Sequence, residues 1–196
     1  MIKTLLCASA LMASCVGANA DAVHLNPAQP ASISNMETFG RTSMPVGYYE
    51  YCRRYGDRCA RPADGTSVSL TRERWKEIIR VNNTVNTTVA PVTDSELFGV
   101  EERWDYPQSA GDCEDYALEK RRRLNDMGYP LGALLMTVGR DADGGGHAVL
   151  TVVTDMGDFI LDNQEPRVLL WRDAELTYLK RQSQEDPNDW VSLTAG

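Results

Sequence analysis

The 196-residue chain lacks long apolar runs and has fewer basic than acidic side chains. No segment approaches the roughly 18 continuous apolar residues that a membrane-spanning helix needs, so no transmembrane segment is predicted. The chain has 20 Lys and Arg against 28 Asp and Glu, which gives a formal net charge of -8 at pH 7. Because binding to phosphate backbones depends on clustered cationic side chains, the composition argues against a nucleic-acid partner.

Soft metal ligands and common catalytic motifs are also scarce. The chain has 2 histidines, His24 and His147, and no short-spaced His or Cys pair, which leaves too few ligands for a zinc site. No Gly-x-Ser-x-Gly elbow, phosphate-binding loop or dinucleotide fingerprint is present. Chemistry based on those motifs is therefore not expected.

Residues 1–20 have the layout of a secretory signal peptide. Lys3 precedes an uncharged stretch from Thr4 to Val16, and small residues follow up to Ala20. Cleavage is expected near Ala20, with a periplasmic or secreted location for the mature chain. The alternative is lipoprotein processing at Cys15, which is less favoured because Met12 stands where leucine is usual.

One domain is expected over residues 46–196, since the length and a hydrophobic content of 42% suit a single core. Residues 21–45 are rich in Pro, Ser, Ala and Asn and are predicted to form an extended lead-in. In an oxidising compartment Cys52 and Cys59 lie close enough in sequence to form a disulfide. Cys113 then has no disulfide partner, and three roles are open to it: a buried apolar side chain, a site of intermolecular pairing, or a nucleophile.

Two helices are expected in this domain. Thr71 can cap a helix that runs to about Asn86 and carries a stripe of core side chains. Asp112 can cap a second helix that ends near Met127, with Cys113 in its first turn. Its inner face is predicted to hold Cys113, Tyr116, Ala117, Leu124 and Met127, whereas the basic run 120–123 is predicted to form a solvated face.

Three strands are expected after the second helix, at Leu131–Gly139, His147–Thr154 and Asp158–Asp162. A two-residue turn between the last two strands would pair Thr154 with Gly157 and put His147 and Asp162 on one face of the hairpin. A three-residue loop without a bulge would put them on opposite faces.

Cys113, His147 and Asp162 form the minimum set for thiolate–imidazolium catalysis. A helix N-terminus and a protonated histidine both favour the thiolate, and a carboxylate can orient the imidazole. The carboxylates at 112, 114 and 115 act in the opposite direction, because negative charge beside a thiol raises its pKa. A purely structural histidine and a strand-ending turn at Asp162 are the alternative readings.

Three blocks of this sequence, in this order, resemble the bacterial transglutaminase-like cysteine proteinases. The blocks are Gly111-Asp112-Cys113-Glu114-Asp115-Tyr116-Ala117, Gly146-His147-Ala148-Val149-Leu150 and Ile160-Leu161-Asp162-Asn163-Gln164. That family includes a periplasmic calcium-dependent protease that cleaves a large surface adhesin and so releases biofilm cells. The resemblance covers about residues 46–171 and implies an α+β, papain/transglutaminase-like core. In such a core the nucleophile lies at a helix N-terminus, packed on an antiparallel sheet that carries the His and the Asp.

The resemblance also implies roles for individual residues. Cys113 would be the nucleophile, His147 the general base and Asp162 the orienting carboxylate, with no cofactor for the chemistry itself. In calcium-dependent members the acidic residues beside the nucleophile help to bind the ion, which by position are Asp112 and Glu114. A bound Ca²⁺ would offset the negative charge beside the thiol.

Two further groups of residues were considered for roles near the site. Gln108, five residues before Cys113, is a candidate second oxyanion donor beside the backbone N–H of Cys113. Asp141 and Asp143 offer further oxygens for calcium, although an Asp/Gly turn is the alternative role.

The leading hypothesis is an exported cysteine peptidase that cleaves a specific site in a surface or periplasmic protein, for which a large adhesin is the candidate. A membrane regulatory protein is a candidate partner. The second hypothesis keeps the triad but transfers the acyl group to an amine, as a transglutaminase or amidase does. The third is a non-catalytic periplasmic binding or regulatory module.

Overall fold

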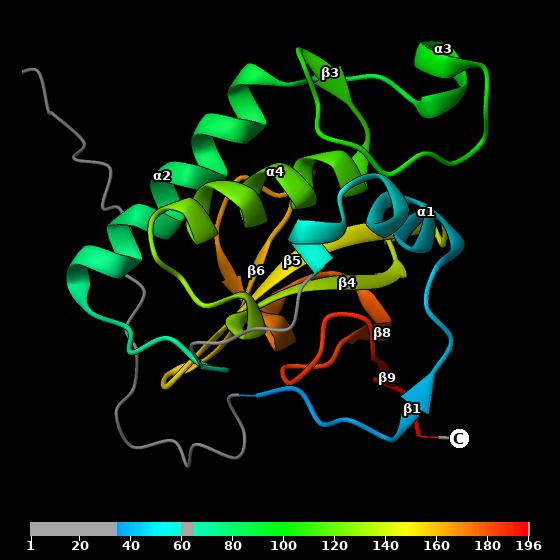
Figure 1. Cartoon of the computed structure of the whole chain (residues 1–196). Coiled ribbons are helices and arrows are strands. Elements are labelled where there is room, and N and C mark those ends of the chain that lie inside the picture. Colours follow the sequence, from blue (N-terminus) through cyan, green and yellow to red (C-terminus); the bar gives the residue numbers. More distant parts are fainter. Residues whose placement is uncertain (1–34, 60–64, 196) are drawn as a thin grey trace, which may run out of the picture.

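The computed structural model describes residues 35–59 and 65–195 (Figure 1). The predictions for the signal peptide at residues 1–20, for Cys15 and for His24 lie outside these ranges. Within the ranges, no helix combines the length and the apolar content needed to cross a bilayer.

The core of the fold is a seven-stranded sheet in which every neighbouring pair of strands is antiparallel. Its strands are β1 (Arg41–Thr42), β4 (Leu134–Arg140), β5 (Gly146–Thr154), β6 (Gly157–Leu161), β7 (Leu169–Leu170), β8 (Thr177–Gln182) and β9 (Trp190–Ser192). They are arranged in the order β1-β9-β8-β4-β5-β6-β7. The longest strand, β5, therefore lies inside the sheet between β4 and β6.

The helices gather on one side of β4 and β5 (Figure 1). The α-helices are α1 (Val46–Arg54), α2 (Arg72–Thr88), α3 (Asp94–Phe98) and α4 (Cys113–Asp126), and the short 3-10 helices are η2 (Gly56–Cys59), η3 (Leu131–Ala133) and η4 (Trp171–Asp173). Helix α4 packs on β4 and β5, and α2 packs on α4. Two short parallel strands, β2 (Ala90–Pro91) and β3 (Ala110–Gly111), join the segments that precede α3 and α4. This arrangement confirms the predicted α+β fold.

Helix α2 forms as its sequence predicts. The Thr71 hydroxyl accepts a hydrogen bond from the N–H of Arg74 at 3.2 Å and so caps the first turn. Ile78, Val81 and Val85 are buried along one stripe, which confirms the assignment of this helix to the core.

Helix α4 begins at Cys113 as predicted, but the prediction of a solvated face over residues 120–123 is wrong. Lys120 and Arg121 are buried, at 0% and 3% exposure. Their burial follows from the position of α4, which is covered by the sheet on one side and by α2 on another. Arg121 Nε donates to the carbonyl of Leu134 at 2.9 Å, which compensates for part of its burial.

The β5–β6 hairpin has the predicted register. Thr154 pairs with Gly157 and Leu150 pairs with Leu161, so the turn contains two residues. Gly157 adopts a φ of 126°, a conformation that L side chains rarely take. This register puts His147 and Asp162 on the same face of the hairpin.

The strand predicted from Leu131 starts later than expected. Leu131–Ala133 is a 3-10 turn, because the N–H of Ala133 bonds to the carbonyl of Pro130 at 3.0 Å. The strand then continues to Arg140, one residue beyond its predicted end.

Packing also begins before Val46, which corrects the predicted extent of the lead-in. Met36 is buried in a small second core with Val149 and Ile160. Its backbone N–H donates to the Asp158 carboxylate at 2.9 Å. A single apolar side chain in a Ser- and Asn-rich segment carries no periodic pattern, so this contact could not be predicted from the sequence.

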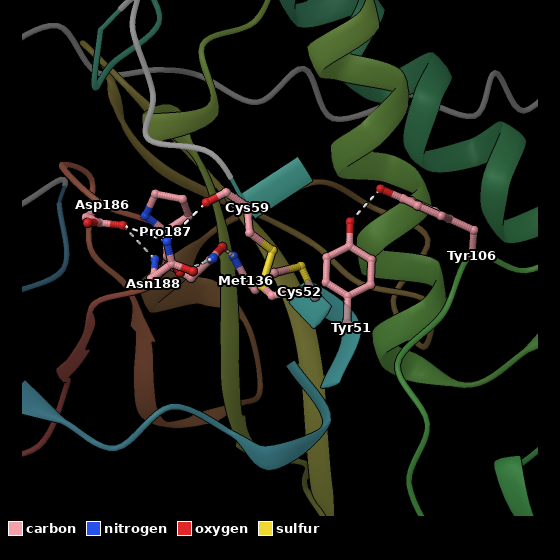
Figure 2. Close-up of a disulfide and its surroundings, with 9 residues drawn as sticks. Tyr51, Cys52, Cys59, Tyr106, Met136, Asp186, Pro187 and Asn188 are labelled. Atoms are coloured by element: carbon pink, nitrogen blue, oxygen red, sulfur yellow. Dashed lines mark hydrogen bonds between the residues drawn. A yellow bond between two sulfur atoms is a disulfide. The ribbon is translucent and has the colours of Figure 1, made fainter. Parts of the chain in front are cut away.

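The predicted disulfide between Cys52 and Cys59 is present and joins α1 to η2 (Figure 2). On one side, Asn188 Nδ2 donates to the carbonyl of Cys59 at 3.0 Å. On the other side, the hydroxyls of Tyr51 and Tyr106 are 2.5 Å apart (Figure 2). Helix α1 therefore ties the C-terminal loop to the segment that leads towards Cys113.

We expect Gly47→Ala to destabilise this α1 anchor. A Cβ at Gly47 would lie 2.6 Å from Nε1 of the buried Trp104, so the helix or the indole would have to shift. The expected loss is about 1–3 kcal/mol of unfolding free energy, measured by urea denaturation. Gly56→Ala is the matched control, since a Cβ there meets no atom within 4 Å. Equal unfolding midpoints for the two variants would contradict this account of the packing.

Candidate active site

Cys113 is the first residue of α4, where the free N–H groups of the helix favour negative charge. Its thiol donates a hydrogen bond to Glu114 Oε2 at 3.2 Å. The backbone N–H of Ala148 points at the sulfur from β5. The thiol therefore lies against the strand residue that directly follows His147.

His147 is bound to Asp162 across the hairpin. Nε2 of His147 and Oδ1 of Asp162 are 2.8 Å apart, and the two side chains are 2% and 15% exposed. The same Asp162 oxygen accepts the N–H of Gln164 at 2.9 Å, and Asn86 Nδ2 of α2 donates to the carbonyl of Asp162 at 2.7 Å. Because Nε2 is committed to Asp162, Nδ1 is the ring nitrogen available to a thiol.

Asp162 is held as a carboxylate by its neighbours. Burial alone would raise its pKa, but the hydrogen bond and charge of His147, the N–H of Gln164 and the charge of Lys120 together hold the pKa below its usual range. Asp162 is therefore ionised at neutral pH and can accept the Nε2–H of His147.

The environment of Cys113 has the opposite effect. Burial raises the pKa of the thiol, and the charge and hydrogen bond of Glu114 raise it further, whereas the Ala148 N–H lowers it. With Glu114 as its acceptor, the thiol stays protonated at neutral pH. Formation of a thiolate requires that the negative charge beside it be offset.

The carboxylates of Asp94, Asp112 and Glu114 converge beside the nucleophile. Each offers an oxygen, and these oxygens lie within 4.8 Å of one another. Oδ1 of Asp94 and Oδ1 of Asp112 are buried without a hydrogen-bond partner among the described residues. Burial and the charge of Asp112 raise the pKa of Asp94, and they raise the pKa of Glu114 to about 9. Crowded, uncompensated carboxylate oxygens suit a hard cation such as Ca²⁺.

Asp94 was not predicted as a calcium ligand; the sequence pointed to Asp112 and Glu114, with Asp141 and Asp143 as further candidates. The pairing of β2 with β3 brings the start of α3 beside the start of α4. Asp112 then turns its Oδ2 to the N–H of Asp94, at 3.2 Å, and makes no side-chain cap of its own helix. Thr93 and Glu96 form a capping box that marks a helix start in the sequence, but its position relative to α4 is a tertiary property.

The loop at Asp141 forms the Asp/Gly turn that was the alternative to a calcium role. Asp141 Oδ1 accepts the N–H groups of Asp143 and Gly145 at 3.1 and 2.8 Å. Its carboxylate is therefore engaged within its own loop.

Two cavities border the site. One, of about 570 Å³, is lined by Phe98, Tyr106 and the exposed Gln108, among others. The other, of about 270 Å³, is lined by Asp162 and by residues that follow β6, including Arg167. The oxyanion role of Gln108 stays a prediction.

Comparisons with known proteins identify the family of this chain. A family model described as bacterial transglutaminase-like cysteine proteinase matches residues 38–196. The structure of EGTA-treated LapG from Legionella pneumophila is 25% identical over 60% of this chain and 66% of LapG, with a TM-score of 0.50. The match thus spans just under two thirds of that LapG chain.

The calcium-bound form of Legionella pneumophila LapG is 21% identical over 79% of this chain and 84% of LapG, with a TM-score of 0.53, and supports the fold. No curated protein shows significant sequence similarity to the chain. Because the family model covers far more than half of the sequence and includes the whole candidate site, the protein belongs to the bacterial transglutaminase-like cysteine proteinases.

Proposed function

We propose that Cys113, His147 and Asp162 carry the cysteine peptidase chemistry of this family member, and that its substrate is a specific site in a surface adhesin. The observation that carries the proposal is the 2.8 Å contact between His147 and Asp162, on the strand against which the Cys113 thiol lies. The nucleophile thus comes from α4, the base from β5, and the orienting carboxylate from the residue that follows β6.

In the proposed reaction the sulfur of Cys113 attacks the scissile carbonyl as the thiol proton moves to Nδ1 of His147. That proton then passes to the leaving amine, and water hydrolyses the acyl-enzyme. Asp162 keeps Nε2 protonated and stabilises the imidazolium. The N–H of Cys113, at the helix start, donates to the oxyanion, with Gln108 as the proposed second donor.

Asp94, Asp112 and Glu114 are the residues that would hold Ca²⁺ in this chain. The bound ion would supply positive charge beside the thiol. A Glu114 carboxylate committed to a cation no longer competes with His147 for the thiol proton. The forms of Legionella pneumophila LapG described as calcium-bound and EGTA-treated support a calcium role in a protein of similar fold.

We also propose that the chain is exported, with cleavage near Ala20, and that a membrane protein regulates it. The exported form should have the mass of a chain that starts at Asp21, measured by intact mass spectrometry. A lipid adduct on a chain that starts at Cys15 would favour the lipoprotein alternative instead.

Replacement of the triad should abolish cleavage of a purified adhesin fragment. We expect no product from Cys113→Ala, and a rate about 10²–10⁴-fold lower for Asp162→Asn, because the amide cannot hold the imidazolium. Asp155→Asn is the matched control, since Asp155 occupies the turn at the opposite end of the same hairpin. Products are followed by mass spectrometry.

Cleavage that persists in Cys113→Ala would rule out this mechanism. A wild-type protein that links a labelled primary amine to glutamine and leaves the peptide bonds intact would support the acyl-transfer alternative instead.

The proposed calcium site predicts that Asp94→Asn weakens Ca²⁺ binding at least tenfold, because a buried anionic ligand is lost. The affinity is measured by isothermal titration calorimetry on the full chain. Asp141→Asn is the control, since that carboxylate is engaged in its own loop. If both variants bound Ca²⁺ as tightly as the wild type, the cluster of Asp94, Asp112 and Glu114 would not be the site.

A further inference from the structure

Lys120 lies on the face of α4 that carries the nucleophile. Seven residues separate it from Cys113, which is almost two full turns, so the two side chains follow one stripe of the helix. That stripe includes the buried Ala117 and Leu124 and packs on β4 and β5. Lysine side chains on a helix lean back towards its N-terminus, which here is the end that holds the candidate triad.

The ammonium group of Lys120 is buried without a hydrogen bond. The residue is 0% exposed, and Nζ has no hydrogen-bond partner among the described residues. Nζ lies over the face of the Tyr116 ring, 6.0 Å from its centroid. Burial lowers the pKa of Lys120 to about 7, and the charge of Asp162 opposes that shift. Such a group destabilises the fold relative to an apolar side chain of similar size.

Asp162 is the carboxylate whose charge acts on this ammonium. The titratable groups that act on Asp162 or respond to its charge are His147 on β5, Lys120 on α4 and Tyr178 on β8. Below neutral pH, Lys120 is the group that can carry a positive charge beside Asp162 throughout the reaction. His147 changes its charge during the reaction, and Tyr178 is uncharged at that pH. When the imidazole is neutral, Lys120 therefore supplies the positive charge that acts on Asp162, beside the hydrogen bonds from His147 and Gln164.

We propose that Lys120 is a positioning residue of the peptidase, whose buried ammonium keeps Asp162 ionised so that His147 presents Nδ1 as the base. The inference rests on the proposed triad of Cys113, His147 and Asp162. Lys120 touches neither thiol nor substrate and acts only through Asp162.

The consequence for the base follows from hydrogen-bond polarity. An ionised Asp162 can only accept, so the imidazole proton stays on Nε2 and Nδ1 keeps its lone pair. A protonated Asp162 could donate to Nε2 and would drive the imidazole proton to Nδ1, where it would block proton transfer from the thiol. The cation thus prevents a wrong tautomer in a buried site.

The test compares Lys120→Met with Arg181→Met, which removes another buried cation. Arg181 lies on β8, and its Nε and Nη1 also lack hydrogen-bond partners within residues 35–59 and 65–195, but its charge acts on Asp158. The readouts are kcat and KM for the adhesin fragment at about pH 6.5, below the pKa of Lys120, and the thermal unfolding midpoint of each full chain.

We expect Lys120→Met to lower kcat at least tenfold with KM within twofold of wild type, and to unfold at the same or a higher temperature. Lys120→Arg, which keeps the charge, should recover kcat to within about fivefold of wild type. Arg181→Met should keep kcat within twofold. A merely structural lysine would instead show parallel losses of kcat and stability, as any disruptive core substitution does, and that result would overturn the inference.

If Lys120→Met does not fold, the inference can still be tested by measuring the electrostatic coupling between Lys120 and Asp162 directly. The titration of the Lys120 side chain is followed by carbon NMR at its ε position, and Asp162→Asn should lower the Lys120 pKa further below 7 because it removes the opposing charge. An unchanged titration, or a wild-type kcat in folded Lys120→Met, would refute the inference while the triad stands. If Asp162→Asn cleaved the adhesin fragment at the wild-type rate, the proposed triad would be refuted, and the role of Lys120 with it.

Discussion

The register of the β5–β6 hairpin is the constraint on which the candidate site depends. His147 is the second residue of β5 and Asp162 directly follows β6. The two-residue turn puts both on one face, where Nε2 of His147 and Oδ1 of Asp162 are 2.8 Å apart. A shift of one residue would move one of them to the opposite face and break the contact. The rest of the fold supports this register: β4 pairs along the other edge of β5, and Asn86 of α2 binds the backbone of Asp162.

The candidate site is also constrained by the negative charge around the nucleophile. Cys113 lies between Asp112 and Glu114, with Asp94 and Asp162 on neighbouring elements, in a chain of net charge -8. Without compensation these carboxylates oppose the thiolate that a cysteine peptidase needs. The two proposed sources of compensation act at different places: a cation held by Asp94, Asp112 and Glu114 would act at the nucleophile, and Lys120 acts at the far end of the triad. The site thus separates activation of the thiol from orientation of the base.

The sequence predicts those parts of the structure that local rules control. The start of α4 at Cys113, the cap at Thr71 and the turn after Thr154 follow from caps, alternation and glycine placement. The burial of Lys120, the packing of Met36 and the approach of Asp94 to Glu114 depend on contacts between distant segments, and no local pattern encodes them. A basic run on a helix is usually a solvated face, so Lys120 was assigned to the surface by a rule that holds for most helices.

Two of the features that local rules missed, the burial of Lys120 and the crowding of Asp94 with Glu114, cost folding free energy where they stand. A buried ammonium without a hydrogen bond and buried carboxylate oxygens without partners would all be replaced by apolar or neutral side chains if stability alone shaped the core. They lie on α4, at its N-cap and at the start of α3, although other polar atoms without a partner among the described residues, such as those of Arg181, occur elsewhere too. They lie beside a thiol and an imidazole that must lose or gain a proton during acyl transfer. Their charges act on those groups, which is a chemical reason for keeping them despite their cost in stability. Lys120 is the clearest case, because methionine could fill its volume without the desolvation penalty but could not supply the charge that Asp162 meets.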